Sequence, residues 1–98
     1  MKDLVNQLNK AFENRIRLGI MSALMVNDRL SFNRIKELLG VTDGNLASHL
    51  RALEKLEYLK MEKQFVDRKS HTSYQVSALG RKAFQEHLSY LERLINPK

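Results

Sequence analysis

Apolar residues recur every three to four positions through the first half of the chain, which is the spacing of amphipathic helices. The pattern predicts a short helix over residues 3–11 and, after a capping Asn14, a second helix that runs to about Val26. This second helix is apolar around much of its circumference, so we expect it to lie buried at the centre of the domain. Asn27 and Asp28 end it.

A short helix is predicted over residues 32–39, after a segment, residues 29–31, that can form a very short strand or a cap. Its inward face should carry Ile35, Leu38 and Leu39. Gly40 suits the left-handed conformation in which many helices end. Thr42 is suited to cap the next helix, which runs to about Leu56.

The helix after Thr42 has one narrow apolar stripe, and its other faces are polar. The stripe consists of Leu46, Leu50, Leu53 and Leu56. Two amphipathic helices joined by a tight turn are typical of a helix-turn-helix, which we place at about residues 31–57. In such a unit the second helix enters the major groove of DNA.

From Tyr58 the pattern alternates, which predicts two strands at residues 58–65 and 72–77. Residues 66–71 between them are polar and basic, and are expected to form the projecting loop of a wing that spans about 58–77. Ser77 can cap a last helix over residues 78–95. The apolar residues of that helix have heptad-like spacing: Phe84, Leu88, Leu91 and Ile95.

The predicted fold class is therefore mainly α with a small β-hairpin (α+β), a winged helix-turn-helix in the order α-α-(β)-α-α-β-β-α. Residues 1–98 are expected to form one domain, because no linker, repeat or low-complexity segment interrupts them. No apolar run approaches the roughly 20 residues that span a bilayer, and the first residues lack a signal-peptide core. We therefore expect a cytoplasmic protein with no membrane partner.

The net charge of +6, from 17 Lys and Arg against 11 Asp and Glu, favours a polyanionic partner, although simple solubility would also explain it. The absence of cysteine excludes disulfides and thiolate metal sites.

Two motifs carry a family resemblance: LASHLRALEKLEYL at residues 46–59 and YQVSALGRKA at residues 74–83. They resemble the winged-helix regulators of the ArsR/MarR superfamily, and most closely its small stand-alone DNA-binding proteins, over about residues 12–95. That family often shows Ser/Arg-His-Leu-x-x-Leu in the recognition helix and Tyr-x-Leu-Thr-x-x-Gly before the last helix. Val76 and Ser77 replace the usual Leu and Thr, and both replacements preserve the strand and cap roles.

The edge of the 42–56 helix opposite the leucine stripe is polar and short-chained, so it can approach base edges closely. Asn45 can bond adenine in bidentate fashion, Arg51 can reach guanine or a phosphate, and Ser48 can donate or accept. The DNA-binding residues predicted in this segment are Thr42, Asp43, Gly44, Asn45, Ser48, His49 and Arg51. A merely solvated helix face is the alternative for the set. Asp43 can accept from cytosine or only cap the first turn.

For His49, the resemblance implies a place near the DNA backbone, and the alternative is a packing histidine bonded to a carbonyl. Further predicted contacts come from the first turn of the preceding helix and from the wing: Ser31, Asn33, Arg34, Lys63, Arg68, Lys69 and His71. Arg68 could enter the minor groove, whereas Lys69 suits a phosphate. The wing tip could instead be a mobile, solvated turn.

The two terminal helices are predicted to expose apolar residues that form a homodimer interface: Leu4, Val5, Leu8, Phe12, Phe84, Leu88, Leu91 and Ile95. Dimerisation would set two recognition helices about 34 Å apart, one turn of B-DNA, as an inverted-repeat operator requires. The alternative is that these helices pack on each other within one chain.

No convergent nucleophile, base and charge stabiliser is present, so the sequence predicts no enzyme, no catalytic residues and no cofactor. A metal site is not expected either. His87 has only Glu86 and Glu92 nearby on its helix, and we interpret it as a surface histidine. The sequence identifies no small-molecule effector. It points to a homodimeric transcriptional regulator, for which we expect repression, although the sequence leaves activation open. The alternatives are a protein-protein interaction module and a double-stranded RNA binder.

Overall fold

The computed structural model describes residues 1–97. Its elements in chain order are α1 (Lys2–Gln7), the 3₁₀ helix η1 (Lys10–Phe12), α2 (Arg15–Met25), β1 (Leu30–Ser31), α3 (Phe32–Leu39), α4 (Asp43–Lys55), β2 (Leu59–Val66), β3 (Lys69–Val76) and α5 (Ala78–Ile95). The predicted winged helix-turn-helix class is confirmed, and the order differs from the prediction only where the first helix divides into α1 and η1.

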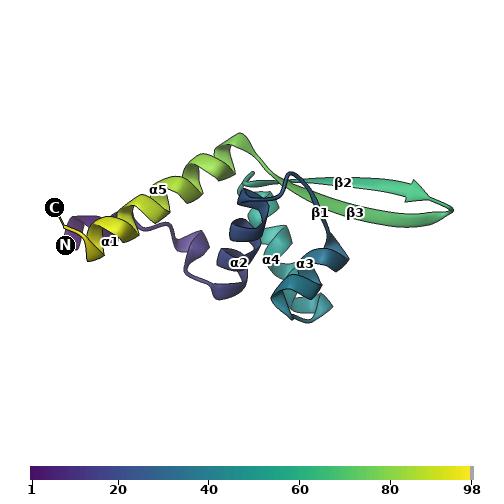
Figure 1. Cartoon of the computed structure of the whole chain (residues 1–98), viewed down its shortest axis with the longest axis horizontal. Coiled ribbons are helices and arrows are strands. Elements are labelled where there is room, and N and C mark those ends of the chain that lie inside the picture. Colours follow the sequence, from purple (N-terminus) through teal and green to yellow (C-terminus); the bar gives the residue numbers. More distant parts are fainter. Residues whose placement is uncertain (98) are drawn as a thin grey trace.

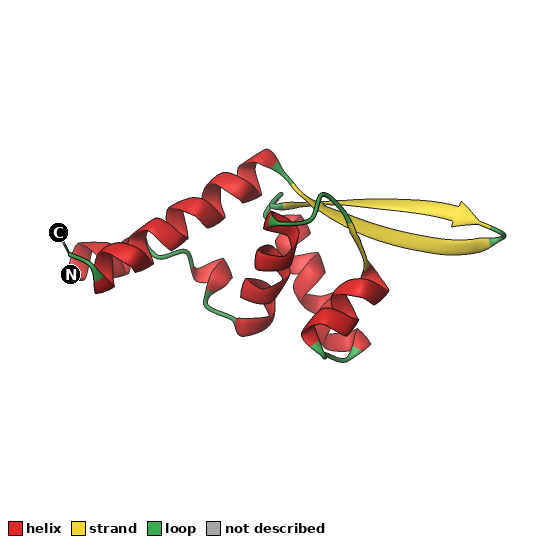
Figure 2. Ribbon diagram, in the orientation of Figure 1, coloured by secondary structure: helices red, strands yellow, loops and turns green. Residues whose placement is uncertain are grey.

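The domain is elongated, with principal extents of 55 × 25 × 21 Å. The hairpin of β2 and β3 projects from one end, and α5 runs to the opposite end, where α1 lies beside it and both ends of the chain are found (Figure 1). Helices α2, α3 and α4 cluster between these extremes (Figure 2). The sheet is antiparallel in the order β1-β3-β2, so the short β1 flanks the hairpin beside the helical body.

The core forms where α2 meets the inner faces of α3, α4 and the base of the hairpin. As expected, α2 is central, since its Ile20, Met21 and Leu24 are fully buried. The core also contains Ala11, Phe12, Ile35, Leu46, Leu50, Leu53, Leu59, Tyr74 and Phe84. Burying a large apolar side chain contributes about 1.5–3 kcal/mol, so this cluster holds the helix-turn-helix and the wing base together.

Side-chain caps begin four of the helices as the sequence predicts. Asn14 accepts hydrogen bonds from the backbone N–H groups of Ile16 and Arg17. Ser31, Thr42 and Ser77 each accept one from the backbone three residues later, in α3, α4 and α5. Gly40 ends α3 in the left-handed region at φ 62°, which sets the tight turn before α4.

The predicted helix over residues 3–11 is wrong, because the chain is interrupted in its middle. Leu8 is extended, with ψ at 138°, and Asn9 then begins η1 by accepting from the N–H of Ala11. Asn9 is held by long-range partners: its backbone N–H donates to Nδ1 of His87 and its amide donates to the hydroxyl of Tyr58, both at 3.0 Å. These bonds to distant elements favour the break over a continuous helix.

The predicted loop at residues 66–71 is also wrong, because the strands extend almost to the tip. Val66 pairs with Lys69, so only Asp67 and Arg68 form the turn. Both have positive φ, 52° and 67°, which matches the twist of a two-residue hairpin turn. The wing therefore covers the predicted residues, but its strands are longer and its loop is shorter than the sequence suggested.

Burial differs from expectation at four apolar positions. Leu38 and Leu56 were placed on inward faces but are exposed, the latter because it lies beyond the end of α4. Phe12 and Phe84 were expected to be exposed for dimerisation, yet they are buried and pack edge-to-face with ring centroids 5.1 Å apart. No helix within residues 1–97 is both long and apolar enough to cross a membrane.

A close junction fixes the start of α5 to the corner between α4 and β2. The hydroxyl of Ser77 donates to the carbonyl of Glu57 at 2.6 Å, and the backbone N–H of Ser77 donates to the carbonyl of Tyr58 at 2.9 Å. Gly80 allows this approach, since a Cβ there would lie 2.1 Å from the Tyr58 oxygen. The terminal helix is thus attached directly to the end of the helix-turn-helix.

Candidate nucleic-acid interface

The amphipathic helix α4 divides into a buried edge and an exposed edge. Leu46, Leu50 and Leu53 are at most 1% exposed and attach the helix to the core. The exposed edge carries Asp43, Gly44, Asn45, Ser48 and Arg51. This edge begins with short side chains and ends with a guanidinium, so bases could approach its N-terminal half closely while Arg51 reaches further.

Two of the predicted contact residues already have ionic partners within the domain. The carboxylate of Asp43 lies 2.8 Å from the ammonium of Lys36, across the helix-helix turn, and Arg34 lies 3.1 Å from Glu37. All four side chains are well exposed, so these pairs add little stability. The Lys36 charge beside Asp43 nevertheless reduces the repulsion that this carboxylate would exert on a phosphate.

His49 lies half-buried between the two edges of α4, and it contacts Arg17 rather than the carbonyl considered from the sequence. Its Nδ1 accepts a hydrogen bond of 3.0 Å from Nε of Arg17 in α2. The neutral ring therefore carries its proton on Nε2. Burial, and then the Arg17 charge, lower the pKa of His49, which favours this neutral form. Arg17 was missed from the sequence because nothing local links it to a residue 32 positions away.

The leading helix and the wing meet in a small notch of about 230 Å³. It is lined by Ser31, Phe32, Asn33, Ser70, His71 and Thr72. Three residues predicted separately, Ser31, Asn33 and His71, are thus brought together by the pairing of β1 with β3. The hydroxyl and amide side chains of this notch, together with the backbone N–H groups at the start of α3, are suited to bind a phosphate.

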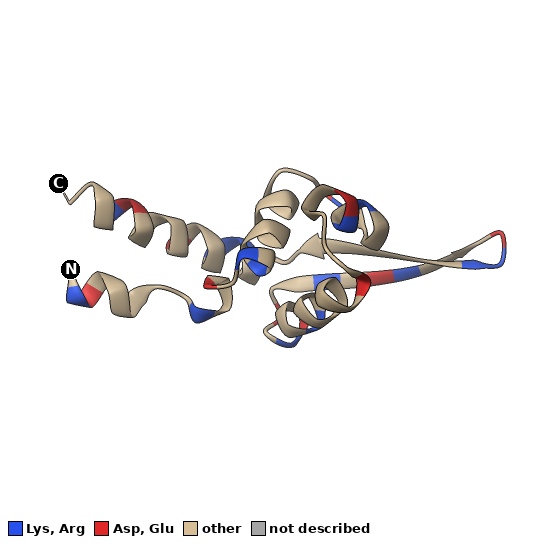
Figure 3. Ribbon diagram, turned by 90° about the horizontal axis from the view of Figure 1, so that it is seen from below, with Lys and Arg blue, Asp and Glu red and all other residues tan. Residues whose placement is uncertain are grey.

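The wing carries the remaining predicted contacts away from the helical body. Lys63, Arg68 and Lys69 are exposed, and Asp67 lies among them at the turn. Figure 3 shows this arrangement as basic colouring toward the far end of the hairpin with acidic colouring at its extremity. The predicted contacts therefore fall into three groups, which lie on α4, at the start of α3 with its notch, and on the wing.

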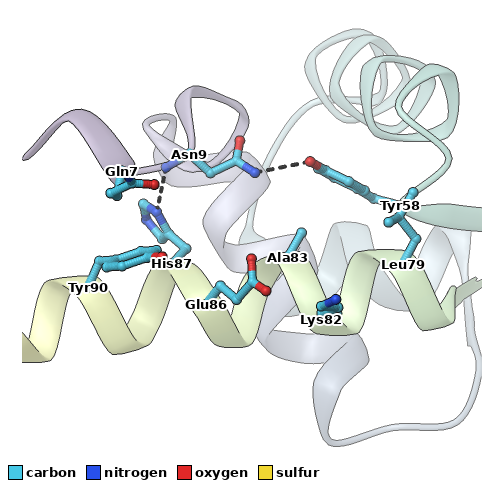
Figure 4. A pocket seen from close by; sticks show the side chains of 9 residues that line it. All are labelled: Gln7, Asn9, Tyr58, Leu79, Lys82, Ala83, Glu86, His87 and Tyr90. Atoms are coloured by element: carbon cyan, nitrogen blue, oxygen red, sulfur yellow. Dashed lines mark hydrogen bonds between the residues drawn. The ribbon is translucent and has the colours of Figure 1, made fainter. Parts of the chain in front are cut away.

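A cavity of about 320 Å³ lies away from α4, between the N-terminal segment and α5 (Figure 4). His87 lines it and is only 4% exposed, so the interpretation as a surface histidine is wrong. Nδ1 of His87 accepts from the Asn9 backbone, and the ring packs on Phe12 at 5.3 Å. Burial lowers the pKa of His87, which the nearby Glu13 charge opposes in part. This histidine anchors the N-terminal segment to α5.

Comparison with known proteins agrees with this geometry. The family model described as a winged helix DNA-binding domain matches residues 16–95. The uncharacterised protein MJ0432 of Methanocaldococcus jannaschii is 32% identical over 79 residues, which cover 81% of this chain and 86% of that protein.

Solved structures show the same fold along nearly the whole chain. A transcriptional regulator homologue from Pyrococcus horikoshii OT3 superposes with a TM-score of 0.89 at 32% identity, covering 99% of this chain and 97% of that one. The putative transcriptional regulator ytfH from Salmonella typhimurium gives 0.71 at 25% identity, covering 90% and 80%. The resemblance inferred from the two sequence motifs is confirmed.

Proposed function

The chain belongs to the family of winged helix DNA-binding domains, and from this premise we propose that it is a homodimeric transcriptional repressor of an inverted-repeat operator. The family is one of DNA-binding regulators, not of enzymes. A protein that binds genomic DNA in this way would work in the cytoplasm.

The proposal rests on the division of α4 into a buried apolar edge and an exposed polar edge. Three buried leucines fix one edge of α4 in the core. The rest of the domain therefore holds the other edge, with Asn45, Ser48 and Arg51, in a fixed position facing solvent. Bidentate bonding by Asn45 to adenine and by Arg51 to guanine would each discriminate by about 1–3 kcal/mol. In this account Asp43 and Gly44 lie at the start of the same edge.

Contacts to the DNA backbone would position α4 in the groove. The residues proposed for these contacts lie at the starts of α3 and α4 and at the notch beside the wing: Ser31, Asn33, Arg34, Thr42 and His71. Backbone N–H groups and hydroxyls at such places can donate hydrogen bonds to phosphate oxygens. His49, with its proton on Nε2, could donate to a phosphate while Arg17 holds its other nitrogen. Lys63, Arg68 and Lys69 would extend the contact along the wing, with Arg68 at the minor groove.

The dimer is supported by an apolar strip that the fold leaves uncovered. Helix α1 packs against α5 of the same chain, yet Leu88, Leu91 and Ile95 remain 43%, 38% and 80% exposed at helical spacing. Val5 is exposed on α1 as well, whereas Leu4 and Leu8 are half-buried. Pairing two copies through this strip would bury it, and the Ser77 junction would transmit the dimer geometry to α4. Repression would follow if the dimer covers a promoter.

The test is selection of genomic fragments by the purified protein, followed by footprinting. We expect fragments that share two inverted half-sites with centres about 10–10.5 base pairs apart, or a multiple of that spacing. The triple variant Asn45→Ala, Ser48→Ala, Arg51→Ala should lose the selected motif, whereas Lys10→Ala, a control on η1, should keep it. Recovery of fragments with no common motif would contradict sequence-specific binding.

A further inference from the structure

The wing exposes a large aromatic side chain that the domain does not cover. Phe65 is 76% exposed, two residues before the hairpin turn. Side chains alternate along the hairpin, so Phe65 shares a face with Lys63, Met61 and Leu59. At the base of this face Leu59 is buried among the helices, but near the tip no helix within residues 1–97 lies over it (Figure 1).

The cross-strand pairing leaves the ring without an apolar partner. Phe65 lies opposite Ser70, and Lys63 on the same face lies opposite Thr72. Small polar neighbours of this kind cannot shield a phenyl ring, so Phe65 contributes little to folding. An aromatic side chain that its own domain leaves 76% exposed is available to a partner, and the charge around it favours a polyanion.

Basic groups flank Phe65 on the wing. Lys63 precedes it on the same face, and Arg68 follows at the turn beside Asp67, while Lys69 pairs with Val66 and so lies on the opposite face. An apolar ring between cationic side chains on a narrow, two-stranded projection is complementary to the minor groove, where phosphates line both walls around apolar sugars and base edges. Proteins that enter this groove use apolar side chains to open base steps, most readily at flexible pyrimidine–purine steps.

We propose that Phe65 enters the minor groove of the bound DNA and partly unstacks a base step, so that the wing selects deformable sequence. This inference rests on the proposed function, because it concerns the DNA that α4 binds. The basic residues of the wing would then bind DNA of any sequence. The phenyl ring would add a preference for flexible base steps in the DNA that lies under the wing.

The experiment compares Phe65→Ser and Phe65→Leu with the wild-type full chain, using the duplex that the wild type selects. Phe65→Ser should weaken binding about tenfold, since an apolar contact is lost. It should leave the salt dependence unchanged, because no phosphate contact is removed. Phe65→Leu should retain most of the affinity. Val66→Ser is the matched control, since Val66 is the adjacent exposed apolar residue on the opposite face of the hairpin.

Unstacking has its own readout. A 2-aminopurine placed at a pyrimidine–purine step under the wing should brighten when the wild type binds, and should stay dim with Phe65→Ser. If Phe65→Ser binds as tightly as the wild type, or if 2-aminopurine stays dim with both, the inference is overturned while DNA binding stands. A change in oligomeric state with Phe65→Ser would assign the ring to a second copy instead. Failure of the wild type to select any duplex would overturn the proposed function and the inference with it.

Discussion

Replacing Gly80 with alanine should destabilise the domain, although alanine is ordinarily the better helix former. Gly80 lies in the first turn of α5, where its N–H donates to the Ser77 hydroxyl. A Cβ at this position would lie 2.1 Å from the carbonyl oxygen of Tyr58 and 2.8 Å from its carbonyl carbon. These are backbone atoms, so no flexible side chain can move aside to make room.

The two opposing effects can be compared in magnitude. Alanine gains at most about 1 kcal/mol over glycine in a helix. Overpacking against a fixed backbone costs typically about 1–3 kcal/mol, and here it also strains the bond from the Ser77 N–H to the Tyr58 oxygen. We expect Gly80→Ala to lower the free energy of unfolding by about 1–2 kcal/mol, with each kcal/mol lowering Tm by about 4–8 °C.

Gly44 provides the matched control. It too lies in the first turn of a helix, α4, but a Cβ there would meet nothing within 4 Å. Gly44→Ala should therefore stabilise the domain, by up to about 1 kcal/mol. The assay is urea and thermal unfolding followed by circular dichroism at one fixed protein concentration, because dimerisation makes Tm concentration-dependent. If Gly80→Ala raises the free energy of unfolding as much as Gly44→Ala does, α5 does not make the close contact with the backbone of Tyr58.

Three further predictions concern charge, assembly and pH. DNA binding should weaken as the salt concentration rises. Lys69→Ala should reduce the slope of log affinity against log salt by about 1 per wing, whereas Lys10→Ala should leave the slope unchanged. Equal slopes for the two variants would show that Lys69 does not contact DNA. Leu88→Glu should yield monomers by light scattering, and an unchanged dimer would refute the α5 strip. Burial lowers the pKa of His87, so this histidine takes up a proton more readily in the unfolded chain than in the folded one. The free energy of unfolding should therefore be retained above about pH 6.5 and fall as the pH drops below it. His49, whose pKa is also lowered, contributes to the same fall, so His87→Gln should reduce the fall in part and His71→Gln should leave it unchanged. Equal curves for the two variants would contradict the buried anchor.

The sequence predicts the elements whose signals are local. Asn14, Thr42 and Ser77 each begin a helix by bonding backbone groups a few residues away, and Gly40 ends one by its own conformation. Such signals need no tertiary information, which is why the bounds of α3 and α5 match their predictions. The leucine stripe likewise predicts which edge of α4 is buried, as far as Leu53.

The errors arise where distant residues decide the outcome. The break at Asn9 depends on His87, 78 positions away, and on Tyr58, 49 positions away. The tight turn at Asp67 and Arg68 lacks the glycine that usually marks positive φ, so the sequence favours a loop there. Phe12 and Phe84 belong to helical apolar patterns, but only their mutual packing shows that they face inward.

The sequence preference of variants on the exposed edge of α4 tests most directly whether this edge reads bases. Selection from random duplexes should give one motif for the wild type and for Lys69→Ala, which loses only a phosphate contact. Asn45→Ala and Arg51→Ala should each lose the preference at one position of the half-site while still binding DNA. If both variants select the wild-type motif without change, α4 does not read the sequence and the account is contradicted.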